Sequence, residues 1–225
     1  MKVLTYVGCY TDEKKEGIHI FESDTETGAF RPVGLVGGIE NAIYLSLNKA
    51  RTRLYAGLGL QEFGGRNVNG AVAAYAIQGD TLLPLNHKPI GVTPPCYVAL
   101  APDEKSLVFA EYTNALSGVF ELTEDGRIAD KPPVTVTHTG SGPDPKRQEK
   151  AHAHCAEVSP DGRHLCIVDL GIDRVKVYDF PGRAAGLKEK PALAIATAGG
   201  AGPRHIIFHP NGKTAYLLNE LNNTI

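Results

Sequence analysis

The sequence has no tryptophan, a single methionine and no long apolar run among its 225 residues. Without tryptophan it cannot carry the Trp-Asp signature of one large class of repeat proteins. No segment approaches the roughly 18 consecutive apolar residues that a membrane-spanning helix requires. The first residues turn charged at Asp12-Glu13-Lys14-Lys15 and lack the apolar stretch and cleavage site of a secretory signal. We therefore expect a cytoplasmic protein that does not enter a membrane.

Cysteines and basic residues are few, and neither type is arranged for metal or nucleic-acid binding. No Cys-x-x-Cys or similar metal spacing occurs, so we expect free thiols. The formal net charge is −2, and a nucleic-acid surface would need a concentrated basic stripe. The densest basic stretch, residues 146–150, is interrupted by Glu149, and we interpret it as a solvated loop. No nucleic-acid partner is expected.

The common motifs of nucleotide binding and serine hydrolysis are missing. Two glycine-rich stretches, residues 57–70 and 197–204, suggest phosphate loops, but neither contains G-x-x-x-x-G-K-[ST] or opens a helix. No G-x-S-x-G elbow is present, so a serine-hydrolase triad is not supported. We predict a site that needs no cofactor.

What the sequence does contain is a repeated hairpin. A short apolar strand, a turn rich in Pro, Asp, Asn and Gly, and a second apolar strand recur four times, with turns at Asn48, Pro102, Pro160 and Pro210. These turns are 54, 58 and 50 residues apart, and such periods with short strands are typical of β-propeller blades. A doubly wound or barrel fold would need helices between the strands, and none of adequate length is indicated. The prediction is an all-β propeller of four-stranded blades.

Further strands complete the predicted blades. Third strands are expected over residues 71–77, 118–122 and 173–180, and outer strands over 28–34, 82–88 and 187–195. Strands at 4–10 and 17–24 belong to an earlier blade. The chain thus covers about four to five blades, with a partial blade at each end. We expect one propeller domain over residues 1–225 that continues past Ile225; a small ring closed by its terminal strands is the alternative.

The residues just before two of the inner strands carry reactive side chains. His152 and His154 are two apart, so on a strand they share a face. They could supply a general base, bind a metal if a third ligand joined them, or make structural hydrogen bonds. Arg204, followed by His205, comes after the glycine-rich stretch 197–203. Its planar fork suits a phosphate or carboxylate, and a salt bridge between blades is the other interpretation.

Glu220 closes the last apolar strand, at residues 214–219. A carboxylate in this place can be a base, an arginine partner or a hydrogen-bond acceptor between blades. Aligning the hairpins matches Glu220 with Asp169 and Glu111. That regularity favours a partly structural role for the position.

Three phrases of the sequence resemble one family. These are TYVGCYTDEKKEGIHIFESDTETG near the start, residues 144–180 and residues 202–225. Together they are similar to the seven-bladed propeller 6-phosphogluconolactonase family. The resemblance implies a ring of seven blades, a cytoplasmic step of the pentose phosphate pathway, and hydrolysis of 6-phospho-D-glucono-1,5-lactone to 6-phosphogluconate. The related fungal muconate-lactonizing enzyme implies a site of His152 or His154, Arg204 and Glu220, with a further arginine beyond Ile225.

The expected chemistry follows from these residues. His154, Glu220 and His152 are the predicted catalytic residues, with His154 or Glu220 taking a proton from water. Arg204, His205 and Asp169 are the predicted substrate-binding residues, and the partner is a small sugar-phosphate lactone. Two other functions stay open: an enzyme that forms or opens a carboxylated lactone, and a non-catalytic propeller that serves as an interaction platform. The oligomeric state stays open as well.

Overall fold

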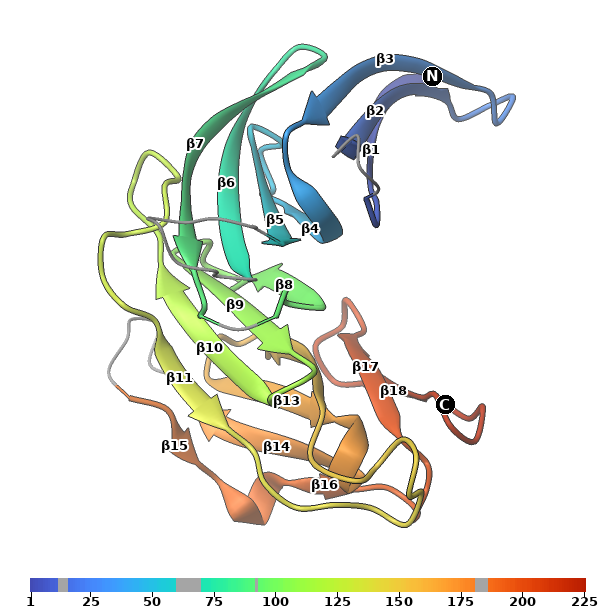
Figure 1. Cartoon of the computed structure of the whole chain (residues 1–225), viewed down its shortest axis with the longest axis vertical. Coiled ribbons are helices and arrows are strands. Elements are labelled where there is room, and N and C mark those ends of the chain that lie inside the picture. Colours follow the sequence, from blue (N-terminus) through green and yellow to red (C-terminus); the bar gives the residue numbers. More distant parts are fainter. Residues whose placement is uncertain (12–15, 60–69, 92, 181–185) are drawn as a thin grey trace. The chain divides into compact units, whose positions relative to one another are not determined.

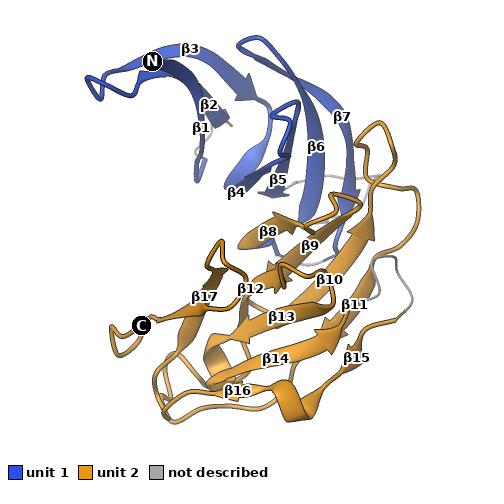
Figure 2. Ribbon diagram, turned by 180° about the vertical axis from the view of Figure 1, so that it is seen from behind, with its two compact units in different colours: residues 1–95 blue, residues 96–225 orange. Residues whose placement is uncertain are grey.

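The computed structural model describes residues 1–11, 16–59, 70–91, 93–180 and 186–225. The chain forms two compact units, residues 1–95 and 96–225 (Figure 2). Antiparallel strands dominate, and the only helices in the described ranges are two short 3-10 turns, Leu170–Ile172 and Pro191–Leu193. The all-β prediction is confirmed. None of the helices in the described part of the chain has the length and apolar character to cross a membrane.

Unit 1 contains two antiparallel sheets (Figure 1). The first has the order β1-β2-β3, with strands Lys2–Gly8, Glu16–Asp24 and Phe30–Gly37. The second has the order β4-β5-β6-β7, with strands Glu40–Leu47, Arg53–Gly59, Ala71–Gln78 and Thr81–Pro89.

The core of unit 1 consists of side chains at every second position of these strands. Ile18 and Ile20 of β2 pack with Leu54 and Leu58 of β5 and with Tyr75 of β6, all at most 4% exposed. The period of two places one face of each sheet in the core. Fully burying a side chain of this size contributes about 1.5–3 kcal/mol, so this pattern holds the unit together.

Unit 2 contains three antiparallel sheets (Figure 1). The order β8-β9-β10-β11 comprises Tyr97–Leu100, Ser106–Glu111, Leu116–Glu121 and Val134–Thr137. The next sheet runs β12-β13-β14-β15, with β16 also on β14, and comprises Ala153–Val158, His164–Asp169, Arg174–Asp179, Lys188–Glu189 and Ile195–Ala196. The last sheet pairs β17, Pro203–Phe208, with β18, Ala215–Asn219.

The predicted blades are found, with one outer strand broken and another missed. Three complete blades and a partial one at each end match the sheets β4–β7, β8–β11, β12–β16, β1–β3 and β17–β18. The outer strand expected over 187–195 is interrupted by the turn Pro191–Leu193. Proline has no N–H for a ladder, which explains the break. Strand β11 was not predicted; it has only four residues, Val134–Thr137.

The hairpin turns share one backbone conformation. Gly162 and Gly212 have φ of 70° and 66°, and Arg51 and Glu104 adopt the same left-handed region at 54° and 57°. Each of the four donates its N–H to the carbonyl three residues earlier. In the first two hairpins a non-glycine residue therefore bears the strain of this turn. The accepting carbonyls belong to Asn48 in the first hairpin and to Ala101 in the second, so these two residues are equivalent. The sequence alignment of Asn48 with Pro102 was wrong by one residue.

All four cysteines are free thiols. Cys155 and Cys166 are buried, as strand residues of an apolar core should be. Cys9 and Cys96 are only half-buried, and Cys9 lies just beyond the end of β1. Burial raises the pKa of Cys96 to about 12 and that of Cys166 to about 11. These two thiols are therefore protonated and unreactive at neutral pH.

One glycine controls how two loops of unit 2 approach each other. A Cβ on Gly171 would lie 1.9 Å from the carbonyl oxygen of Lys150 and 2.8 Å from the amide nitrogen of His152. We expect Gly171→Ala to lower the free energy of unfolding by about 1–3 kcal/mol, because the backbone must move apart. Urea unfolding measures the effect. Gly37→Ala is the control, since no atom lies within 4 Å of its added Cβ; equal losses in both variants would contradict the prediction.

Candidate functional site

Two consecutive sheets of unit 2 begin with a β-bulge, and the bulged residues are His154 and Arg204. The ladder of β12 and β13 shifts register between Ala153 and Cys155, and that of β17 and β18 shifts between Pro203 and His205. His154 and Arg204 thus hold the same extra position in two neighbouring repeats. A bulge turns its extra side chain out of the regular alternation, which is common next to active sites.

Strand register also decides where Glu220 lies. Asp169 and Asn219 end β13 and β18, and each pairs with the residue just before the bulge. Asn219 is therefore the counterpart of Asp169, and Glu220 corresponds to Leu170. The alignment that matched Glu220 with Asp169 was wrong by one residue. A shift of one position moves a side chain to the other face of a strand, so the two carboxylates have different surroundings.

Four side chains form what we call the ionic cluster: Arg147, His154, Arg204 and Glu220. Nη2 of Arg147 lies 2.5 Å from Oε1 of Glu220, and Nε of Arg204 lies 3.0 Å from Oε2. Nε of Arg204 also donates to Nε2 of His154 at 3.0 Å. The hydrogen bond that Arg147 donates to Glu220, and then the one with the Tyr112 side chain, raise the pKa of Arg147. Both oxygens of one carboxylate are thus held by guanidinium groups, one from the loop before β12 and one from β17.

His154 is held in its neutral form. It accepts from Arg204 at Nε2, so that nitrogen carries the lone pair, and Nδ1 has no partner among the described residues. Burial, followed by the charges of Arg204 and His205, lowers its pKa to about 4. An imidazole with this pKa is a weak base at neutral pH. The other candidate base of the cluster is the carboxylate of Glu220.

His205 lies beside His154, with 5.0 Å between the ring centroids, and its ring is also 5.5 Å from that of Tyr97. Burial, and then the charge of Arg204, lowers the pKa of His205. The ring is half-buried and borders the cluster. A role in substrate contact is compatible with this place and stays a prediction.

His152 occupies a supporting position. Its Nδ1 lies 3.1 Å from the carbonyl oxygen of Tyr112, and Nε2 lies 3.1 Å from Oε1 of Glu149. Its ring stacks on that of Tyr112 at 4.2 Å, while His154 meets the same ring edge-on. Both ring nitrogens thus face oxygens of neighbouring residues, and His152 positions Tyr112 and Glu149. Its expected catalytic role stays a prediction.

Asp169 is a structural carboxylate. It is fully buried, and Oδ1 accepts from the amides of His152 and Gly171 at 2.7 and 3.0 Å. Oδ2 lies 2.7 Å from Nδ1 of His138, whose Nε2 lies 3.0 Å from the hydroxyl of Tyr178. With no exposed surface and three partners, Asp169 fixes the backbone at His152. Its expected substrate-binding role stays a prediction.

A second buried pair, Gln148 and Asp173, joins the loop that carries Arg147 to the segment that leads into Arg204. Nε2 of Gln148 donates to Oδ1 of Asp173 at 2.8 Å. Asp173 also accepts from the amides of Gly200 and Gly202, at 2.7 and 2.8 Å. Gln148 is the neighbour of Arg147, and Gly202 lies two residues before Arg204. Two amides of the glycine-rich stretch 197–204 thus donate hydrogen bonds to a buried aspartate. The other glycine-rich stretch, 57–70, lies mostly outside the described residues.

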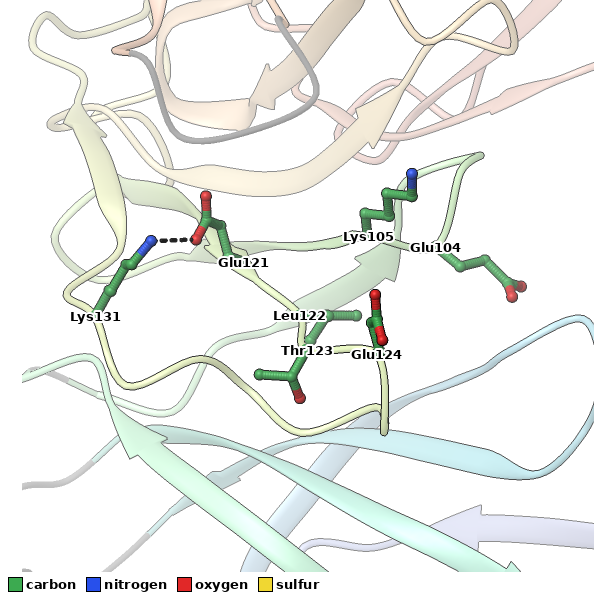
Figure 3. A pocket seen from close by; sticks show the side chains of 7 residues that line it. All are labelled: Glu104, Lys105, Glu121, Leu122, Thr123, Glu124 and Lys131. Atoms are coloured by element: carbon green, nitrogen blue, oxygen red, sulfur yellow. Dashed lines mark hydrogen bonds and ion pairs between the residues drawn. The ribbon is translucent and has the colours of Figure 1, made fainter.

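A surface cavity elsewhere in unit 2 has different chemistry (Figure 3). Its volume is about 560 Å³, and its charged lining residues are three glutamates and two lysines. Lys131 points at Glu121, 2.9 Å away, in an exposed pair that stabilises little. Histidine and arginine are missing from this lining. No group of three or more His, Cys, Asp or Glu in the described ranges is arranged to hold a metal ion.

Comparison with known proteins places this geometry in a family. The family model "Lactonase, 7-bladed beta-propeller" matches residues 4–225. The chain belongs to this lactonase family. The 6-phosphogluconolactonase of Bacillus subtilis is 38% identical over 226 residues, covering all of this chain and 61% of that protein. Two solved structures are similar: a Lactobacillus plantarum protein (TM-score 0.83, 32% identity) and the periplasmic gluconolactonase of Pseudomonas aeruginosa (TM-score 0.85, 28% identity).

The match extends over nearly the whole chain but not over the whole relatives. Each of those two structures aligns with 98% of this chain, which in turn spans 61–62% of their length. The predicted fold class, a seven-bladed propeller family, is confirmed by these comparisons. Within the lactonase family, the ionic cluster of this chain is the candidate site.

Sequence reasoning missed Arg147, Gln148 and Glu149. The stretch 146–150 was interpreted as a solvated loop, yet Gln148 is fully buried, and its two neighbours contact Glu220 and His152. Alternating charges around one amide residue look like an ordinary surface loop. The signal that could have identified these residues was their position, because the stretch leads directly into the candidate residue His152.

The lowered pKa of His154 predicts a pH dependence of stability. Its pKa falls from 6.5 to about 4 on folding, so protons favour the unfolded chain between these values. The free energy of unfolding should therefore decrease as the pH falls from about 6.5 to about 4, by up to about 3 kcal/mol from this residue. His205 contributes in the same direction.

We expect His154→Gln to flatten this decrease, measured by urea unfolding at several pH values. The control is His209→Gln, at an exposed histidine of the same unit. Identical pH profiles for wild type and His154→Gln would contradict the prediction.

Proposed function

We propose that the ionic cluster is a lactonase site that hydrolyses 6-phospho-D-glucono-1,5-lactone to 6-phosphogluconate. The observation that carries the proposal is Glu220 held between Arg147 and Arg204, beside the neutral His154, in a chain of the lactonase family. This arrangement offers a base and positive charge at one place. Ester hydrolysis requires both, because water must lose a proton while negative charge develops on the carbonyl oxygen.

The reaction can be written with the residues of the cluster. Glu220 accepts a proton from water, and the water oxygen attacks the lactone carbonyl carbon. The resulting oxyanion collapses and breaks the bond to the ring oxygen, which leaves as a hydroxyl after receiving the proton from Glu220. Arg204 supplies positive charge to the bound substrate, and the uncharged His154 borders the reacting group without competing for the proton. The step consumes one water and requires no redox change.

The charges of the cluster favour an anionic substrate. Two guanidinium groups face one carboxylate, which leaves one positive charge in excess. His154 and His205 add no charge at neutral pH, since both pKa values are lowered. The excess suits the phosphate of a sugar-phosphate lactone. The name of the Bacillus subtilis relative, 6-phosphogluconolactonase, supports the same substrate.

A lactone bearing a carboxylate, and a propeller that only binds partners, remain the other proposals. The same guanidinium groups would hold a carboxylate. The cytoplasm remains the proposed compartment and is supported by the four free thiols. A similar protein, the Pseudomonas aeruginosa gluconolactonase, is named as periplasmic, so similar proteins can differ in their compartment.

Removing the proposed base tests the reaction. We expect the 225-residue chain to hydrolyse freshly made 6-phosphogluconolactone faster than its spontaneous rate. Glu220→Gln should lower kcat by about a hundredfold to ten-thousandfold, since the amide accepts no proton. The control is Glu124→Gln, in the separate cavity of Figure 3. Full activity in Glu220→Gln would reject Glu220 as the base, and no acceleration by a folded protein extended past Ile225 to seven blades would reject the lactonase proposal.

Removing the second arginine tests the substrate. Arg204→Ala should raise KM for 6-phosphogluconolactone much more than KM for unphosphorylated gluconolactone, because only the former carries a phosphate. Steady-state assays on both lactones give the comparison, with Arg163→Ala, at an exposed ion pair, as the control. Equal increases for both substrates would contradict a phosphate contact.

A further inference from the structure

The contacts of Glu220 have the form of an occupied anion site. Arg147, in the loop before β12, and Arg204, in β17, converge on one carboxylate, one arginine to each oxygen. Their side chains remain 43% and 42% exposed, and that of Glu220 is 28% exposed. A solute can therefore reach the guanidinium groups without unfolding of the loops.

The two arginines are held in place by buried groups that do not involve Glu220. Gln148, fully buried beside Arg147, donates to Asp173, and Asp173 accepts from the amides of Gly200 and Gly202 ahead of Arg204. Both loop backbones are thus tied to one buried aspartate. If the carboxylate of Glu220 moved away, these hydrogen bonds would keep the arginine backbones in place, and a preorganised pair of guanidinium groups would remain.

The arginine donors are not used up. Within the described residues, Arg204 contacts Glu220 and His154 through Nε, which leaves Nη1 and Nη2 available. A guanidinium group binds a phosphate best through two parallel N–H donors. Arg204 therefore offers a further anion an edge that Glu220 does not occupy.

We propose that Arg147 and Arg204 form a binding site for a phosphate group, and that Glu220 is the internal anion that occupies it in the free protein. Binding of a phosphate displaces the carboxylate from one or both arginines. The displacement frees the lone pairs of Glu220 for a water molecule. The proposal rests on the proposed function in one respect, namely that the phosphate belongs to the lactone; the exchange of anions can be measured without turnover.

The exchange would make hydrolysis depend on the substrate's phosphate. Each oxygen of Glu220 already pairs with one arginine, and a phosphate that takes over the arginines releases both oxygens for water. An unphosphorylated lactone would leave Glu220 engaged. Arg147, which sequence reasoning placed in a solvated loop, thereby becomes a specificity-determining residue.

The test measures inorganic phosphate binding to the 225-residue chain by isothermal titration calorimetry at pH 7 and low salt. Glu220→Gln should bind phosphate at least about tenfold more tightly than the wild type, because no competing carboxylate fills the site. Arg147→Ala added to Glu220→Gln should abolish the gain, while Arg147→Lys should retain part of it. Circular dichroism of each variant establishes that it is folded.

The matched control is Asp161→Asn, which removes the carboxylate from an exposed ion pair with Arg163. It should not change phosphate affinity. Unchanged affinity in Glu220→Gln, or a gain that survives Arg147→Ala, would overturn the proposal. These outcomes are separate from the lactonase assay: phosphate exchange without hydrolysis would reject only the proposed function, and hydrolysis without exchange would reject only the anion site.

Discussion

The candidate site depends on the buried hydrogen bonds of Asp173. Its carboxylate accepts from Gln148 and from the amides of Gly200 and Gly202, so a single side chain fixes the residue after Arg147 and the segment before Arg204. A buried carboxylate is stable only when donors surround it, and removing one donor would leave a charge without compensation. The geometry of Arg147, Arg204 and Glu220 follows from this requirement. The ionic cluster itself is half-exposed and could not hold its own loops.

The repeated hairpin gives the fold a set of equivalent positions, and the site uses the places where neighbouring repeats differ. His154 and Arg204 hold the same bulge in successive repeats, yet one is a neutral imidazole and the other a permanent cation. Asp169 and Asn219 likewise end equivalent strands, but only Asp169 is a carboxylate, and it is fully buried. Packing keeps the backbone of each repeat similar, whereas side chains on bulges and at strand ends can vary at little cost to the core.

The sheets could be predicted from the sequence because short apolar strands and tight turns are local signals. Candidate residues could be predicted as well, since His154, Arg204 and Glu220 lie at the ends of recognisable strands. The roles of His152 and Asp169 could not. Both depend on contacts across many residues, with Tyr112 and His138 respectively, and no local pattern reports them. A one-residue error in aligning Glu220 with Asp169 was enough to confuse a partly exposed carboxylate with a buried one.

The sequence by itself determined that this is an all-β chain of repeated blades, which side chains begin its inner strands, and which family it resembles. These properties reside in the period of the apolar residues and in the turns. Only the tertiary structure decided that Arg147 reaches Glu220 and that His152 is fully engaged. Arg147 and Glu220 are 73 residues apart in the chain. The physical reason is that ion pairs and buried hydrogen bonds require three-dimensional proximity, which chain folding creates and local sequence does not encode.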